Sequence, residues 1–147
     1  MFTESVKYAI QTMMHLAVNQ NDFFLINTIA EDHDIPKFYL SKLVQSLSNY
    51  HLVRSKPGRN GGIKLNKPSE EIKIIDIIYA IEGPPPEKEM CIFGIDICSD
   101  SVPCPVHEKW KPMKKKLHNE FMEKDLASLA KELHRKHEIL GNIIDKK

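Results

Sequence analysis

The sequence lacks long hydrophobic runs, an excess of either charge and an even number of cysteines. Its 147 residues include 21 basic and 20 acidic side chains, which give a formal net charge of +1. The most apolar stretch, Ile72 to Ile81, is interrupted by Lys73 and Asp76, whereas a membrane helix needs about 20 mostly apolar residues. No secretory signal is visible, because charged residues interrupt the start of the chain. We therefore expect a cytoplasmic protein with no membrane partner.

The low net charge, the odd number of cysteines and the lack of catalytic motifs further restrict the possible functions. A net charge near zero gives no bulk attraction to nucleic acid. Three cysteines in a chain of this kind argue against a closed disulfide framework, and leave metal ligation, a reactive thiol or core packing. No Ser–His–Asp order, nucleotide-binding loop or paired-carboxylate spacing favours catalysis. The chain is therefore not expected to be an enzyme.

The spacing of apolar residues predicts four helices and a hairpin in the first 81 residues. The second helix starts at Asn27 or Thr28, since Thr28 and Glu31 have capping-box spacing, and it ends before Pro36. Three of the six glycines lie in the turn Pro57–Gly62, which indicates a tight hairpin. The other expected helices are 3–19, 36–49 and 73–81, and the expected strands are 52–56 and 63–66.

This order is typical of a mainly α fold with a small β-hairpin, a winged helix-turn-helix domain over residues 1–83. The third helix would enter the major groove, and the hairpin would form the wing. Residues 53–68 contain five basic and no acidic side chains, so the local charge suits a phosphate backbone, although an ordinary solvated hairpin has similar features. The candidate contacts to double-stranded DNA are Thr28, Lys37, Tyr39, Ser41, Lys42, Lys56, Arg59 and Asn60.

Residues 84–107 form a loop that holds all three cysteines and five of the nine prolines. Six residues separate Cys91 from Cys98, five separate Cys98 from Cys104, and His107 follows within the same 17 residues. Four soft or borderline ligands at this density indicate a metal site. The lack of a tight Cys-x-x-Cys pair favours an iron–sulfur cluster, [2Fe–2S] or [4Fe–4S], over zinc. Thiol–disulfide sensing and inert packing remain alternatives.

Helical periodicity returns over residues 108–147, which we expect to hold dimerisation and C-terminal helices, the last one capped by Asp125. An apolar seam runs along the first of these helices through Trp110, Met113, Leu117 and Phe121. Such a seam needs a partner, either a second copy of the chain or its own first helix. A homodimer would match two half-sites of a palindromic operator.

The chain resembles the Rrf2 family of bacterial transcription regulators, and the resemblance extends over nearly its whole length. The residues that carry it are Ile29-Ala30, Ile35, Leu40, Leu43, Leu47, Leu52-Val53, Ser55, Gly58 to Leu65, with the Gly-x-x-Gly-Gly wing, and Ile81-Glu82-Gly83. The resemblance implies a homodimeric winged-helix repressor whose long helix after the loop forms the dimer.

The resemblance also bears on the cysteines. Cluster-binding members of the family carry three cysteines at similar spacing, and one type adds a histidine and a tryptophan that match His107 and Trp110, although its first cysteine spacing is five instead of six. In another type the fourth ligand is a carboxylate near the N-terminus. The position here that best matches that carboxylate is Lys7, which cannot serve as a cation. His107 is therefore the implied fourth ligand.

Together these features predict a DNA-binding regulator, a repressor, whose operator affinity is switched by an iron–sulfur cluster. The first alternative is a regulator of the same fold that senses thiol oxidation or a partner protein without metal. The second is a small metal-dependent redox enzyme.

Overall fold

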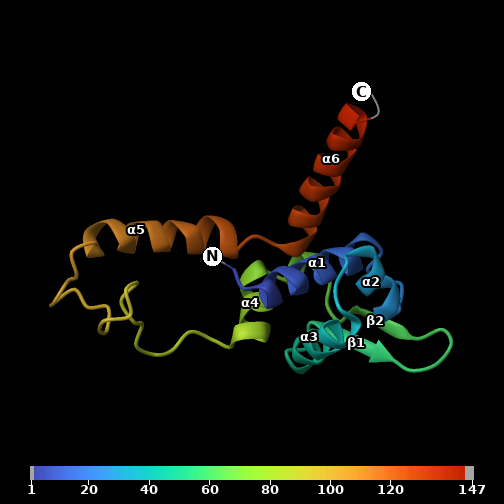
Figure 1. The fold of residues 1–147 in the computed structure, drawn as a ribbon, viewed down its shortest axis with the longest axis horizontal. Coiled ribbons are helices and arrows are strands. Elements are labelled where there is room, and N and C mark those ends of the chain that lie inside the picture. Colours follow the sequence, from blue (N-terminus) through green and yellow to red (C-terminus); the bar gives the residue numbers. More distant parts are fainter. Residues whose placement is uncertain (1, 145–147) are drawn as a thin grey trace.

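The computed structural model describes residues 2–144, with side chains for residues 2–136. The last residues of the predicted C-terminal part, 145–147, lie outside this range. Figure 1 shows the arrangement of the elements. In chain order they are α1 (Glu4–Val18), α2 (Ile26–Asp32), α3 (Lys37–Asn49), β1 (Val53–Lys56), β2 (Gly62–Leu65), the 3-10 turn η1 (Ser69–Glu71), α4 (Ile74–Glu82), α5 (His107–Leu117), the π-helical turn η2 (His118–Met122) and α6 (Leu126–Ile144).

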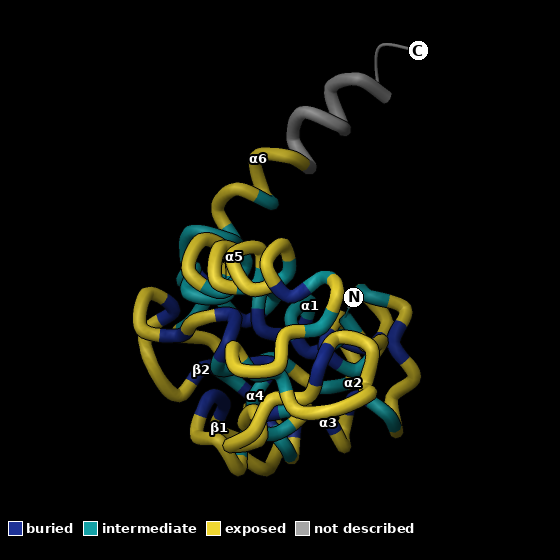
Figure 2. The backbone as a smooth tube through the Cα atoms, turned by 90° about the vertical axis from the view of Figure 1, so that its left-hand side faces the viewer, coloured by how far each residue is buried: buried dark blue, intermediate teal, exposed yellow. Residues whose placement is uncertain are grey.

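The core lies where α1, α3 and α4 pack together, with the base of the hairpin against them. Each helix buries one apolar stripe, because side chains three and four residues apart share a helix face. Met13 and Leu16 of α1, Leu40 and Leu47 of α3 and Ile77 of α4 are fully buried. In Figure 2 most of α5 is yellow, the colour of exposed residues. The predicted mainly α fold with one small hairpin is confirmed.

The predicted start of the second helix is wrong. The helix α2 begins at Ile26, with Leu25 as an extended N-cap that makes no side-chain cap bond. Phe24 is held beside the hairpin by two backbone bonds to Ile63, of 2.9 and 2.8 Å. The chain therefore leaves the sheet at Leu25 and turns at once into the helix, because Ile26 packs against the core. Tertiary packing thus overrides the capping preference of Asn27 and Thr28.

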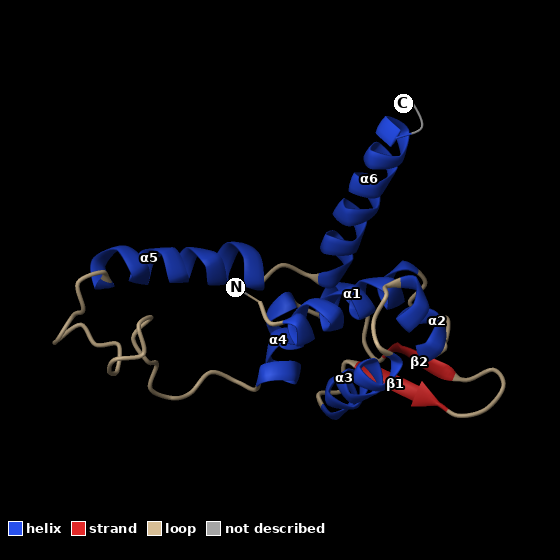
Figure 3. Ribbon diagram, in the orientation of Figure 1, coloured by secondary structure: helices blue, strands red, loops and turns tan. Residues whose placement is uncertain are grey.

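The hairpin pairs β1 and β2 antiparallel, with Val53 opposite Leu65 and Lys56 opposite Gly62. Ile63 and Leu65 face the core, while Arg54 and Lys56 are exposed. This alternation is expected for a sheet with one face on a core and one in water. The turn between the strands projects from the body, as Figure 3 shows in tan beyond the red strands. The residues predicted to meet DNA in the wing therefore stand clear of the core.

Residues 83–106 leave the body after α4 and end far from the core, where α5 begins, and α5 then runs back toward the body (Figure 1). The chain then rejoins the core at Leu126, which is fully buried and donates its backbone N–H to the Ile72 carbonyl at 2.7 Å. The predicted cap of the last helix is confirmed, because Asp125 accepts the backbone N–H of Ser128 at 2.8 Å. The division at residues 83 and 107 stays a prediction. Among the described residues, no helix is both long and apolar enough to cross a membrane.

Two glycines of the hairpin allow a matched test of the wing. A Cβ on Gly62 would lie 2.2 Å from the Phe24 carbonyl oxygen, and the residue has a φ of +129°. Gly58 has a φ of +98° but open space around its Cβ position. Gly62→Ala should therefore lower the free energy of unfolding by about 2–4 kcal/mol, and Gly58→Ala by about 1 kcal/mol. Urea denaturation measures both, and equal losses would contradict the close approach of Phe24.

Candidate functional site

One side of α3 is buried and the other is available to a partner. Leu40, Leu43, Val44 and Leu47 fix the helix on the core. The predicted contact residues Lys37, Ser41 and Lys42 are exposed on the outer side. Phe38 also lies there, with 75% of its surface exposed, and the Lys42 Nζ lies 4.7 Å from its ring centroid. The sequence interpretation missed Phe38, although its place outside the buried stripe indicates that it is exposed.

Of two other predicted DNA contacts, one is exposed and one is half-buried. Thr28 is exposed on α2. Tyr39 does not point outward as expected: it is half-buried, its hydroxyl makes a short contact with the Ser5 hydroxyl, and its ring meets Tyr8 edge-on at 5.9 Å. These contacts with α1 place the ring at the edge of the face. Contact of Tyr39 with DNA stays a prediction.

The wing combines basic side chains with one aromatic ring at its base. The ring of Phe23 lies 4.9 Å from Lys64 Nζ, 5.7 Å from Lys56 Nζ and 6.0 Å from the Arg54 guanidinium carbon. The negative face of an aromatic ring attracts cations, so Phe23 lets like charges gather without an acid beside them. The exposed tip of the wing adds Arg59. Phe23, just before the expected second helix, had no sequence signal for this role.

The basic side chains of α3 and of the wing take no part in the ion pairs of the described chain. None of the ion pairs among the described residues involves a basic side chain of α3 or of residues 53–68. Six of these pairs lie instead in the second half, such as Lys124 with Glu132 at 2.7 Å. The acids that form ion pairs among the described residues thus do so away from α3 and the wing.

The cysteine loop contains a small hairpin that brings two of its thiols together. Met90 and Ile97 form an antiparallel bridge, Cys91 donates its N–H to the Asp96 carbonyl at 2.7 Å, and Cys98 donates to Glu89 at 2.7 Å. Because side chains alternate across a paired strand, Cys91 and Cys98 lie on the same side of this hairpin. The hairpin thus makes neighbours of two cysteines that have six residues between them in the sequence.

All three cysteines and His107 line one cavity of about 700 Å³. The remaining lining is largely apolar, with Ile95, Ile97, Val102 and two prolines. Within the described residues, no group of three or more such side chains is already arranged to hold a metal ion. The structure brings the predicted ligands to one cavity without closing a site around them. Three thiols and an imidazole are a donor set that fits iron, zinc or an iron–sulfur cluster.

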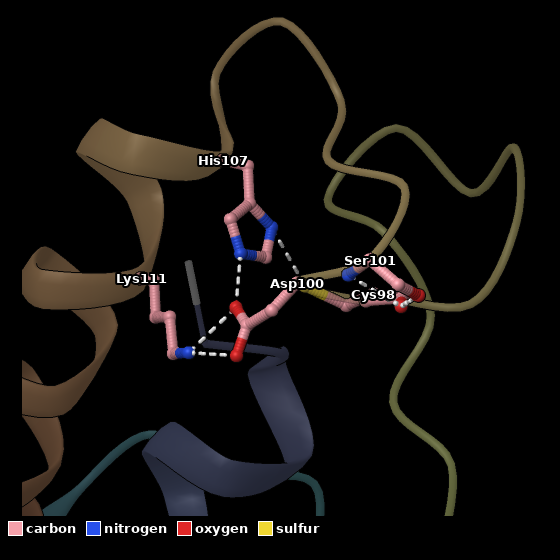
Figure 4. A network of polar contacts seen from close by, with 6 residues as sticks. Cys98, Asp100, Ser101, His107 and Lys111 are labelled. Atoms are coloured by element: carbon pink, nitrogen blue, oxygen red, sulfur yellow. Dashed lines mark hydrogen bonds and ion pairs between the residues drawn. The ribbon is translucent and has the colours of Figure 1, made fainter.

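The imidazole of His107 is held in one orientation. His107 is the first residue of α5 and is 4% exposed. Its Nε2 lies 2.7 Å from Asp100 Oδ1, and Lys111 Nζ bonds both oxygens of the same carboxylate at 2.6 Å, as Figure 4 shows. These bonds, first from Lys111 and then from His107, lower the pKa of Asp100 below its usual value.

The ionised Asp100 can only accept a hydrogen bond, so His107 donates to it through a proton on Nε2. The other ring nitrogen, Nδ1, faces Cys98, whose Sγ is 3.5 Å away. A carboxylate behind a histidine is the arrangement that orients metal-binding imidazoles. The sequence interpretation missed Asp100 and Lys111, because a single acid in a loop and a lysine in a helix give no motif.

The predicted dimer seam is only partly covered within one chain. Met113 is 62% exposed and Phe121 is 38% exposed, while Trp110 and Leu117 are half-buried. Phe121 stacks on Phe2 with ring centroids 6.0 Å apart. It lies in the π-helical turn η2, so the seam does not continue on one straight helix as expected. The homodimer stays a prediction.

Comparison with known proteins identifies relatives over most of the chain. Residues 2–132 match the model of the Rrf2 family, described as iron-dependent transcriptional regulators. A protein of Aquifex aeolicus named as an HTH-type transcriptional regulator is 34% identical over 122 residues, which are 82% of this chain and 84% of that protein.

Two solved structures have the same fold. CymR of Staphylococcus aureus in its oxidized form is 28% identical, with a TM-score of 0.70 over 88% of this chain and 95% of its own. IscR of T. potens is 23% identical, with a TM-score of 0.68 over 90% of this chain and 88% of its own.

The burial of the thiols leads to a prediction about their reactivity. Cys91 is 8% exposed, whereas Cys98 and Cys104 are partly exposed, and a thiol must be accessible to react. Brief treatment of the metal-free protein with iodoacetamide should therefore label Cys98 and Cys104 well before Cys91. Peptide mass spectrometry measures the order, and faster labelling of Cys91 would contradict the packing of the loop.

Proposed function

Because the chain belongs to the Rrf2 family of transcriptional regulators, we propose that it is a homodimeric repressor of palindromic DNA operators, switched by an iron–sulfur cluster. The cluster would be held by Cys91, Cys98 and Cys104, with His107 as the fourth ligand. The observation that carries the cluster is the single cavity that all four side chains line. The proposal is supported further by the Asp100 carboxylate behind His107.

An iron–sulfur cluster, when bound, would cross-link the side chains that hold it and would respond to oxidation. The chain's own part is to gather three thiols and one imidazole, and to keep Nδ1 of His107 directed to the cavity. Lys111 contributes by holding Asp100 behind that ring. Most of the surface that lines the cavity beside the thiols is apolar.

The loop is connected to α5 and through it to the proposed dimer. Glu89 pairs with Lys114 of α5, and Asp100 pairs with Lys111 one turn earlier. A change in the loop would therefore act on α5, whose partner in the dimer is a second copy. Only a difference in operator affinity between the two forms of the loop can produce a switch.

The DNA-binding part of the proposal is supported by the basic side chains of α3 and the wing, none of which is in an ion pair among the described residues. The wing tip would meet the phosphate backbone while the outer face of α3 enters the major groove. We propose the contacts Thr28, Lys37, Tyr39, Ser41, Lys42, Lys56, Arg59 and Asn60, and the dimer contacts Trp110, Met113, Leu117 and Phe121.

A second candidate is a regulator of the same fold that senses the oxidation of its thiols without metal. It is favoured by the lack of a closed ligand set among the described residues and by the partial exposure of Cys98 and Cys104. The likeness to the oxidized form of CymR points the same way. The two candidates differ in whether the active regulator contains iron.

Anaerobic purification distinguishes the two candidates. The protein should carry iron and acid-labile sulfide and absorb visible light, and Cys98→Ala should lose both the metal and the colour. Ser101→Ala, an exposed change three residues away, is the matched control and should keep them.

A colourless, iron-free protein that binds its operator normally, with Cys98→Ala silent in cells, would contradict the cluster. Reversible loss of DNA binding on oxidation of that iron-free protein would support the thiol sensor instead.

The charge of the wing leads to a prediction about salt dependence. Each phosphate contact adds about 0.9 to the slope of log affinity against log salt concentration. Arg59→Ala should therefore weaken binding to a duplex selected from a random library, and reduce the slope by about one unit for each Arg59 in the complex. Lys116→Ala, an exposed change on α5, should leave the slope unchanged. An unchanged slope for Arg59→Ala would remove this residue from the interface.

A further inference from the structure

The outer face of α3 contains an apolar group among its charges. Phe38 is the second residue of the helix and is 75% exposed. One exposed aromatic is ordinary on a protein surface, so exposure alone assigns it no role. Its position is more informative, because the first residues of a recognition helix are those that reach base edges in the major groove.

The neighbours of Phe38 suit a nucleic-acid partner. Lys37 precedes it, and Lys42 lies one turn later with its ammonium 4.7 Å from the ring centroid. Neither lysine is paired with an acid among the described ion pairs. The Lys42 contact also restricts the ring, so less side-chain freedom is lost when the ring meets a partner.

The groups that bases expose in the major groove indicate which of them a phenyl ring can recognise. The edges of adenine, guanine and cytosine present hydrogen-bond donors and acceptors there, and thymine alone adds a methyl group. A phenyl ring has no hydrogen bond to offer and gains by covering that methyl. Ser41 lies one turn along, and its hydroxyl donates a hydrogen bond to the Lys37 carbonyl at 3.0 Å. Phe38 is therefore the side chain of this face that offers an apolar surface to a base.

We propose that Phe38 is a specificity-determining residue that recognises the 5-methyl group of a thymine in each operator half-site. This inference rests on the proposed DNA-binding function and extends it to the base that the helix selects. It concerns α3 alone and does not depend on the cysteine loop.

The test removes the methyl from the DNA and the ring from the protein. A duplex is first selected from a random-sequence library with the wild-type protein. It is then made in two forms, one with thymine and one with uracil, which differ only by the methyl group. The wild type should bind the uracil form about fourfold more weakly for each methyl contacted.

The protein variants assign that difference to Phe38. Phe38→Ala should bind the thymine form more weakly than wild type and no longer distinguish the two forms, whereas Phe38→Leu should keep part of the difference. Tyr50→Ala is the matched control, since Tyr50 is an exposed aromatic at the other end of the same helix, and should discriminate as wild type does. Circular dichroism verifies that each variant is folded.

Three results would overturn the inference. Equal binding of both duplexes by the wild type would show that no thymine methyl is read. An unchanged preference in Phe38→Ala would assign the methyl contact to another residue. Failure of the wild type to select or bind any duplex would contradict the DNA-binding function itself, and the inference with it.

Discussion

The one-sided burial of α3 is the constraint on which the DNA-facing surface depends. Leu40 and Leu47 are completely buried, and they fix both the rotation and the height of the helix on the core. Once these two positions are fixed, the geometry of the helix determines which residues face outward. Lys37, Phe38 and Lys42 therefore share the outer face because of what the opposite side must bury.

A second constraint acts at the start of α5, where one carboxylate links the loop to the helix. Asp100 accepts from His107 and from Lys111, which are one turn apart on α5. These bonds fix the loop near Cys98 and leave Nδ1 of His107 directed to the cavity. The exposed Asp100–Lys111 pair contributes little stability by itself. Its effect is to orient a buried imidazole that has no other described polar partner besides Cys98.

The sequence was sufficient for most of the elements and for the grouping of the three cysteines with His107, because both follow from local rules. Apolar periodicity defines α1, α3 and α4, and the glycine turn defines the hairpin. The sequence was insufficient where contacts between residues far apart in the chain determine where a helix starts or how a side chain points. The bridge between Phe24 and Ile63 moves the start of α2, and α1 draws Tyr39 away from the outer face. Asp100 and Phe23 gain their roles only from neighbours that the fold supplies.

The hydrogen bonds and ion pairs of the cysteine loop restrict how the loop can influence the DNA-facing surface. Among the described hydrogen bonds and ion pairs, those of residues 84–106 stay within the loop or reach α5, and none reaches α3 or the wing. The helix α5 extends from the body with Met113 exposed (Figure 1). In the proposed switch, a signal in the loop would therefore act first on α5. In the proposed dimer the orientation of α5 sets the distance between the two copies of α3, and two half-sites at fixed spacing convert a small change of distance into a change of affinity.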